Sequence, residues 1–380
     1  MIDKNSGFRY TNNHKILSRF NARKVINLAT FKAFLKRKNI EISFKRYGID
    51  ALGAMAQGLF CSLLIGTIIG TLGNLTGAQF LIDIGGYTKA VSGVAMAVAI
   101  GYALKADPMV LFSLATVGYA ANEIGGAGGP LAVLIIAIIA AECGKMVSKE
   151  TKVDILVTPA VTILVGVGLS ALIAKPIGDA ANAFGSLIKS ATELQPFLMG
   201  MTVSVLVGIA LTLPISSAAI CAALSLTGLA GGAAVAGCCA QMVGFAVISF
   251  RENRWGGLVS QGIGTSMLQM PNIMKNPRIW IAPTVTSAIT GPIATCVFSL
   301  QMNGVAVNSG MGTCGFCGPI GVITGWYTPV AEGAAAITPG AMDWIGLVLV
   351  CIVLPAVLAP LINWPLKKLG WVKDGDMKLS

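Results

Sequence analysis

The sequence contains little charge and a single histidine. Only 11% of the 380 residues are Asp, Glu, Lys or Arg, and the one histidine is His14. Soluble domains carry roughly 25% charged residues, so this composition excludes an ordinary soluble fold. The lone histidine also excludes most histidine-based catalysis and metal binding along the rest of the chain. The sequence contains no Ser/His/Asp set, P-loop or HExxH pattern, and we predict no catalytic residue, metal site or cofactor.

Long apolar runs make up most of the remaining sequence. Hydrophobic residues account for 55% of the chain, and its mean hydropathy is +0.77. Several runs with almost no charge are about as long as the roughly 20 residues that cross a bilayer. They cover residues 51–73, 129–146, 155–173, 197–213, 228–250 and 344–362, with shorter candidates at 91–104, 109–121 and 279–300. We therefore predict an all-α integral membrane protein with about ten transmembrane helices.

Positive charge is concentrated at the start of the chain. Residues 1–50 contain 12 of the 27 Lys and Arg residues but only 3 of the 16 Asp and Glu residues. A nucleic-acid-binding arm would also be basic. A juxtamembrane segment attracted to anionic lipid explains the charge more simply, so the bilayer is the expected partner and nucleic acid is not. The positive-inside rule then places both termini in the cytoplasm, with basic loops at 145–152 and 251–278, which favours ten spans over nine.

The two halves of the membrane region differ in character. Residues 51–175 are predicted to form ordinary spans with short connections, followed by an amphipathic helix at 176–195 lying in the membrane interface. In residues 196–365 the apolar runs are interrupted by polar, Gly and Pro clusters at 211–220, 260–277 and 308–322. Irregular backbone at membrane depth is tolerated only where protein buries it or where it lines a watery cavity. We predict broken or re-entrant helices around a polar substrate, although 251–258 and 271–278 also suit ordinary charged loops.

The stretch "NSGMGTCGFCGP" at 308–319 contains two familiar patterns, GxGxxG and CxxC. A dinucleotide-binding loop requires a preceding strand and a following soluble helix, which are not expected between membrane segments. A redox CxxC requires a βαβ context, and a zinc site requires two further ligands. The glycines are better explained by tight turns and by close approach of helices.

Uncharged polar side chains are abundant in the second half. Such groups suit the hydroxyls of a sugar or another small polar solute, and they can also simply join helices. The predicted substrate-binding residues are Ser216, Ser217, Gln261, Thr265, Ser266, Gln269, Asn272, Asn308 and Thr313.

Four carboxylates lie in or near apolar runs. Glu142 is predicted to pair locally with Lys145, and Glu252 to lie in a charged loop. Glu123 and Glu332 are lone charges that suit either a function or the outer interface.

Taken in order and spacing, these features resemble a known family. The stretches "KVDILVTPAVTILVGVG", "AKPIGDAANAFGSLI", "LTLPISSAAI", "GGLVSQGIGTSMLQMPNI" and "GMGTCGFCGP" are similar to EIIC, the membrane subunit of the bacterial sugar phosphotransferase system, and to its PfoR-type branch. The resemblance implies a homodimer in the bacterial cell membrane, with a scaffold and dimerisation half at 51–175. It further implies a substrate-binding half at 196–365 that moves as an elevator, and a separate EIIB partner that phosphorylates the sugar. Residues 1–50 and 366–380 would be a basic cytoplasmic arm and a cytoplasmic tail.

The chain also departs from that family pattern. Fructose-type relatives hold the sugar with a glutamate, whereas the corresponding stretch here, "QGIGTSMLQ", has no carboxylate, and no EIIA or EIIB domain is fused. Whether the protein is itself part of an enzymatic reaction is therefore open. The leading hypothesis is a membrane transporter of a small polar solute, with a sugar or sugar derivative as the expected solute. The alternatives are a ligand-sensing membrane regulator acting through the basic arm, and an uncoupled secondary transporter of a small organic anion.

Overall fold

The computed structural model describes residues 32–331 and 333–379. Most of the predicted basic arm, including His14, and the carboxylate Glu332 lie outside the described residues. Regular structure in the described part is helical, apart from one isolated antiparallel bridge between Gly228 and Met302. The prediction of an all-α membrane protein is confirmed.

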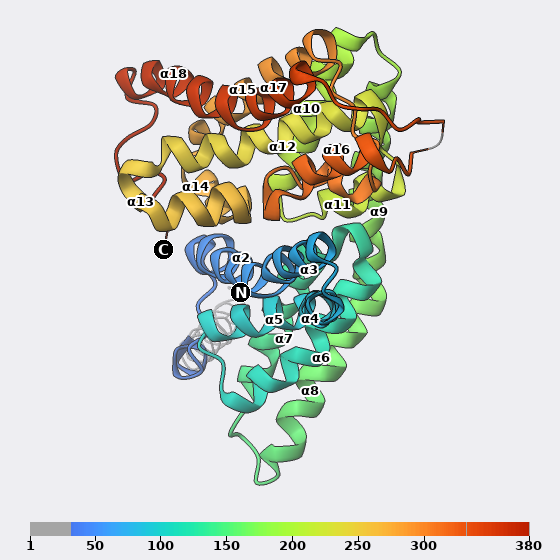
Figure 1. Cartoon of the computed structure of the whole chain (residues 1–380). Coiled ribbons are helices and arrows are strands. Elements are labelled where there is room, and N and C mark those ends of the chain that lie inside the picture. The colour runs from blue at the N-terminus through green and yellow to red at the C-terminus, as the bar shows by residue number, and fades with distance from the viewer. Residues whose placement is uncertain (1–31, 332, 380) are drawn as a thin grey trace, which may run out of the picture.

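The first half forms a helical bundle (Figure 1, lower part). Its helices are α2 Ala51–Leu59, α3 Ile65–Thr76, α4 Gln79–Ala90, α5 Ser92–Ala103, α6 Pro108–Gly125, α7 Gly129–Val147 and α8 Asp154–Leu169. Residues Lys45–Thr76 run as one helix of 32 residues, while α4 and α5 meet at a bend of 48°. The apolar faces converge on fully buried side chains such as Met55, Met96 and Ile136.

Close backbone approach sets the packing of α5 against α6. A Cβ added to Gly93 would lie 2.5 Å from Cβ of Asn122, and one added to Gly118 would lie 2.9 Å from the carbonyl carbon of Gly93. Real Cβ atoms do not approach that closely, so both positions require glycine for this contact. This agrees with the use of small residues where membrane helices meet.

The second half surrounds a central buried helix, α12 (Figure 1, upper part). Its helices are α10 Pro196–Thr212, α11 Ser217–Ala223, α12 Gly228–Ile248, α13 Phe250–Val259, α14 Met270–Lys275, α15 Ile281–Pro292, α16 Cys317–Tyr327, α17 Ala341–Val348 and α18 Leu354–Lys368. In the 18-residue apolar core of α12, 89% of the residues are buried, and α10, α15 and α18 pack around the helix. The sequence of α12 has no polar face because other helices surround α12 on all sides, as is typical of a helix that is hydrophobic all round.

Helix α9, Lys175–Thr192, joins the two halves along one side of the molecule (Figure 1). A Cβ on Gly178 would meet the carbonyl of Gly125 in the first half, and one on Gly185 would lie 3.2 Å from Ile220 in the second. The predicted amphipathic helix is present, with small residues on its buried face. It is not separated from the preceding span, because Asp154–Thr192 forms one helix of 39 residues. At 1.5 Å per residue that helix is about 58 Å long, which exceeds the apolar thickness of a bilayer.

Six helical stretches in the described residues are long and apolar enough to cross a membrane, or seven if the bent α4–α5 pair counts as one span. One of the six, Pro108–Val147, contains both α6 and α7. These two helices are antiparallel, since a Cβ on Gly144 near the end of α7 would lie 2.9 Å from Val110 at the start of α6. The predicted number of ten spans stays a prediction.

The four basic segments gather in two adjoining groups. Arg37 and Lys38 contact the loop around Glu150, and the tail contacts residues 252–276. Asp50 at the start of α2 shares a pocket with Lys275 and Lys378, which joins the two groups. This arrangement agrees with a position of all four basic segments on the same side of the membrane. That this side is the cytoplasm stays a prediction.

Candidate functional site

A small cavity lies where the broken segments of the second half meet the first half. Its second-half lining comes from residues 211–218, 264–267 and 311–314, including Ser216, Ser217 and Thr265. Its first-half lining comes from Leu59, Leu63, Leu64 and Pro130. The cavity measures about 50 Å³, which holds no more than a few water molecules. The structure therefore brings three of the nine predicted residues to one small cavity, with a mainly apolar lining, at the seam between the halves.

Ser216 and Ser217 lie at the point where a helix breaks. Thr212 ends α10, and Ser216 caps the N-terminus of α11 by accepting a 3.2 Å hydrogen bond from the backbone N–H of Ala219. Ser217 Oγ donates a 2.7 Å hydrogen bond to the carbonyl of Gly310 in the second broken segment. A serine cap followed by a short helix stabilises this break in an otherwise apolar run.

The glycine-rich stretch packs against both halves. Gly312 and Gly315 have φ of +53° and +51°, a left-handed conformation that favours glycine. A Cβ on Gly312 would lie 2.8 Å from the backbone of Cys238 in α12, and one on Gly315 would lie 3.1 Å from Ile68 in α3. The GxGxxG pattern therefore provides turns and close contacts, as the sequence analysis predicts.

The CxxC pattern does not form a disulfide. Cys314 and Cys317 are both buried free thiols, and Cys317 Sγ lies 3.2 Å from Thr71 Oγ1 in α3. Within the described residues, no cluster of three or more His, Cys, Asp or Glu side chains is arranged to hold a metal ion. Here Cys317 serves as a packing contact between the halves.

Thr265 and Ser266 occupy the break between α13 and α14. Thr265 is extended and its Oγ1 accepts a 3.2 Å hydrogen bond from the N–H of Met267. Ser266 is fully buried, and its hydroxyl lies 2.8 Å from that of Thr212. Ser266 thus faces away from the cavity lining and into the interior of the second half.

Ser266 belongs to a buried polar network centred on Gln241, which the sequence analysis missed. Gln241 Oε1 accepts a 2.9 Å hydrogen bond from Trp280 Nε1, and its Nε2 donates to Thr284 and Ser287 at 3.3 and 3.4 Å. Gln241 is the one amide side chain in the 21-residue run of α12. That isolated polar group in an apolar helix is the signal that could have identified the network.

Gln261, Gln269 and Asn272 form a row of buried amides at a different place. Gln269 Nε2 donates to Gln261 Oε1, and Asn272 Nδ2 donates to Gln269 Oε1, both at 2.9 Å. The row ends on the chain's own tail, since Gln269 Nε2 also donates to the carbonyl of Met377 at 2.8 Å. Of these three residues, Asn272 alone borders a pocket, the one it shares with Asp50 and Lys378.

The last two predicted residues lie beside the glycine-rich stretch. Asn308 is half-buried and packs against Gly321 of α16. Thr313 is buried and its Oγ1 lies 3.6 Å from the sulfur of Met242 in α12. Neither residue lines the seam cavity.

The carboxylates have structural partners or lie at the surface. Glu142 Oε2 pairs with Lys145 Nζ at 2.8 Å, which confirms the predicted local ion pair. The buried Lys145 ammonium also donates to the carbonyls of Asn39 and Leu104. Glu123 is exposed at the end of α6. The prediction of a charged loop around Glu252 is wrong, because Glu252 is half-buried in α13, where it accepts a hydrogen bond from the tail.

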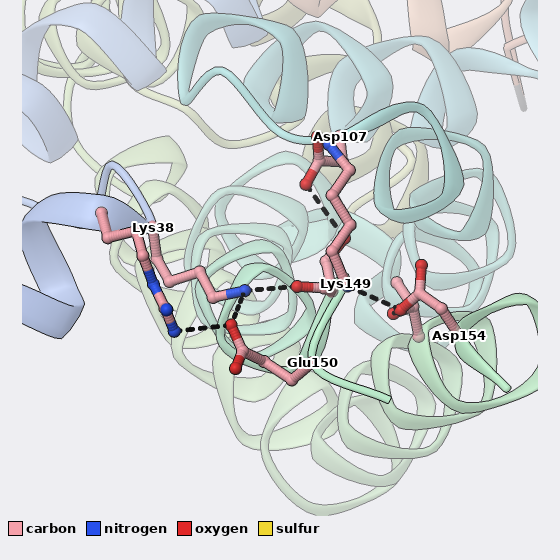
Figure 2. A network of polar contacts seen from close by, with 8 residues as sticks. Lys38, Asp107, Lys149, Glu150 and Asp154 are labelled. Carbon is pink, nitrogen blue, oxygen red and sulfur yellow. Dashed lines mark hydrogen bonds and ion pairs between the residues drawn. The ribbon is translucent and has the colours of Figure 1, made fainter. Parts of the chain in front are cut away.

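A group of ion pairs fastens residues 37–38 to the loop before α8 (Figure 2). Lys38 Nζ pairs with Glu150 Oε1 at 2.6 Å, and Lys149 Nζ pairs with Asp107 Oδ1 at 2.5 Å. The Lys149 backbone N–H donates to Asp154 Oδ1 at 2.7 Å. The hydrogen bond from Lys38 lowers the pKa of Glu150 below its ordinary value, and that from Lys149 lowers the pKa of Asp107. We call these residues the charged clasp.

Comparison with known proteins identifies the family. The model for the phosphotransferase system EIIC family matches residues 49–379. This chain belongs to that EIIC family. It is accordingly a multi-pass membrane protein and a sugar-type transporter component of the phosphotransferase system. EIIC components bind a sugar and work with EIIB partners.

The match covers both halves, α9 and the tail, and it begins just before α2. The resemblance predicted from the sequence is confirmed at the level of the family, while the PfoR-type branch stays a prediction. No curated protein and no solved structure matches the chain. The substrate of this EIIC protein must therefore be inferred from its own residues.

Proposed function

We propose that this EIIC protein carries a sugar or sugar derivative across the bacterial plasma membrane and that the seam cavity is its substrate site in a closed state. One observation supports this proposal. Three interrupted segments of the second half meet at one cavity, and α2 and the residues that continue it border that cavity from the first half. Ser216, Ser217 and Thr265 come from two of those segments. Their hydroxyl groups both donate and accept hydrogen bonds, which suits the hydroxyls of a sugar.

The apolar part of the lining also suits a sugar. Leu59, Leu63 and Met267 border the same cavity and can cover the C–H faces of a pyranose ring. At about 50 Å³ the cavity is too small for a monosaccharide, so the two halves must separate to admit one. We propose that the second half moves against the first half as an elevator, which opens the seam to either side in turn.

Phosphorylation, in this proposal, is carried out by an EIIB partner. No carboxylate or histidine borders the seam cavity in the described part of the chain, and the protein's role is to bind, orient and release the sugar. Gln261, Gln269, Asn272, Asn308 and Thr313 are proposed to contact the solute only after the halves have moved. We further propose a homodimer with both termini in the cytoplasm, in which exposed apolar residues of α8 such as Leu156 and Leu164 face lipid or a second copy.

A thermal-shift experiment tests the proposal. The purified protein is melted in detergent with a panel of sugars, sugar phosphates, sugar acids and small organic anions. A ligand that binds the folded state raises the melting temperature. We expect a shift with a sugar, reduced in Ser217→Ala and kept in Ser186→Ala, which removes an exposed serine on α9 that makes only a local hydrogen bond.

Uptake into vesicles then separates the alternatives. Sugar uptake that requires the phosphorelay supports the coupled permease. Binding without uptake would favour the ligand-sensing regulator, and gradient-driven uptake of anions alone would favour the uncoupled transporter. A sugar shift unchanged by Ser217→Ala would remove the seam cavity as the binding site.

A further inference from the structure

The tail of the chain packs against α13 and α14 of the second half as a short peptide with a turn at residues 374–377. After α18 it runs beside α13 and α14 and ends at the seam between the halves (Figure 1). Two apolar side chains anchor it, because Val372 is 2% exposed and Met377 is fully buried. Between these anchors, Lys373, Asp374 and Gly375 are exposed. We call residues 371–379 the strap and residues 250–278 its cleft.

The cleft contacts the strap mainly through the strap's backbone. Glu252 Oε2 accepts from the N–H of Met377 at 2.9 Å, and Asn253 Nδ2 donates to the carbonyl of Met377 at 2.8 Å. Asn253 Oδ1 accepts from the N–H of Leu379 at 2.8 Å. The amide of Asn253 thus pairs with a carbonyl and an N–H two residues apart in the strap.

The row of buried amides completes this contact. Gln261 Nε2 donates to Ser249 Oγ and to the carbonyl of Gly257, which fixes the direction of its amide. Gln269 and Asn272 follow in the row, and each has one N–H left for the strap. Gln269 gives it to the carbonyl of Met377 and Asn272 to the carbonyl of Lys378. Gln269 and Asn272 are therefore oriented to bind the backbone of the strap, and Gln261 orients Gln269.

The strap also closes a pocket between the halves. Lys378 and Leu379 border this pocket with Asp50 and Gln57 of the first half. The pocket measures about 120 Å³. If the strap leaves, the donors of Asn253, Gln269 and Asn272 lose their partners, and buried polar groups without partners must be hydrated or occupied by another ligand. The pocket would then extend into the vacated cleft.

We infer that residues 250–278 form a binding site for a short peptide held by its backbone, that the chain's own strap is its occupant, and that the strap detaches to open this end of the seam. The strap is held by two buried side chains, by hydrogen bonds to its backbone, by the Asn276–Asp376 hydrogen bond, by the exposed Lys367–Asp374 ion pair and by Arg278 over the Trp371 ring. Segments held in this way open locally without global unfolding. The inference does not depend on which solute the protein carries.

The full-length protein carrying Met377→Gln tests the inference, with Lys378→Gln as the matched control at an exposed position. Asn253→Ala is a second variant that removes two backbone contacts while leaving the strap sequence intact. Hydrogen exchange of the tail reports release. We expect the tail amides to exchange at least tenfold faster in Met377→Gln and Asn253→Ala, with α12 unchanged and Lys378→Gln like wild type.

Binding in trans is the second readout. A fluorescent peptide of residues 371–379, "WVKDGDMKL", is titrated against each protein and followed by anisotropy. We expect saturable binding to Met377→Gln, none to wild type because its cleft is occupied, and none by the same peptide carrying Gln in place of Met.

Three results would overturn the inference. The first is hydrogen exchange of the tail amides that is as slow in both variants as it is in wild type. The second is release of the tail without binding of the peptide to Met377→Gln. The third is loss of cooperative melting in both variants, which would make the tail part of the core.

Discussion

Ser217 Oγ and the carbonyl oxygen of Gly310 are 2.7 Å apart although 93 residues separate them in the chain. The hydrogen bond joins the tips of two broken segments beside α12. Ser309 adds a second link by donating to the carbonyl of Leu226. The two interrupted segments therefore behave as one packed unit, and the cavity that borders Ser217 depends on their register.

Gly310→Ala should disrupt this unit. A Cβ at residue 310 would lie 2.5 Å from the carbonyl oxygen of Ser217, so the two tips must separate. Overpacking of this kind typically costs about 1–3 kcal/mol of unfolding free energy. The matched control is Gly86→Ala in α4, where no atom lies within 4 Å of the added Cβ. We expect a lower melting temperature in detergent for the first variant and an unchanged or higher one for the second; equal melting temperatures would contradict the packing argument.

Gln241→Leu should destabilise the second half. The substitution keeps the side-chain size but removes the acceptor of Trp280 Nε1 and the donor to Ser287. A buried donor left unpaired costs about 1–3 kcal/mol. Denaturation in detergent measures the loss, and Gln301→Leu at an exposed position is the control. A Gln241→Leu protein as stable as wild type would contradict this prediction. It would show that water, or rotation of the Trp280 and Ser287 side chains, replaces the lost hydrogen bonds.

Gln269→Ala should loosen the strap. The amide of Gln269 connects Gln261, Asn272 and the carbonyl of Met377, so its removal leaves three groups short of a partner. We expect faster exchange of the tail amides and a loss of about 1–3 kcal/mol in stability. Gln195→Ala, at an exposed position before α10, is the control. Unchanged tail exchange would mean that Asn253 and Glu252 suffice to hold the strap.

Acidification should weaken the charged clasp. Because Lys38 lowers the pKa of Glu150 in the folded protein, this pair stabilises the fold at pH values above the ordinary pKa of a glutamate. The contribution is lost as the pH falls below the ordinary pKa of a glutamate and through the lowered folded value. The melting temperature of wild type should therefore be slightly above that of Glu150→Gln at pH 7, and the difference should shrink as the pH is lowered to 3.

The effect of salt gives a second measurement on the clasp. The pairs of Glu150 and Asp107 are partly exposed, so 1 M salt should reduce the difference at pH 7. Glu193→Gln, an exposed position near the end of α9, is the control for the loss of one negative charge. A Glu150→Gln difference that persists at pH 3 would point to packing and not to charge.

The amino-acid pattern by itself determined the class of the protein, while its division into a scaffold half and a substrate-binding half stays a prediction. Apolar runs of about 20 residues match the length of a membrane-spanning helix and exceed that of a barrel strand, so the all-helical membrane fold follows from the length of the runs. The family followed from the order of the interrupted segments, and the match over residues 49–379 confirms it. The pair of Glu142 and Lys145 could be predicted because three residues on a helix place two side chains on the same face.

Only the tertiary structure decided how the polar side chains are grouped. Ser217 and Gln269 both follow breaks in apolar runs, yet the first borders the seam cavity and the second binds the tail. Their sequence contexts are alike because a local pattern shows that a buried polar group needs a hydrogen-bond partner. It does not show which distant group is that partner. The partners, Gly310 for Ser217 and Met377 for Gln269, lie 93 and 108 residues away. Contacts at such separations are set by how the helices pack, which periodicity along the chain does not specify.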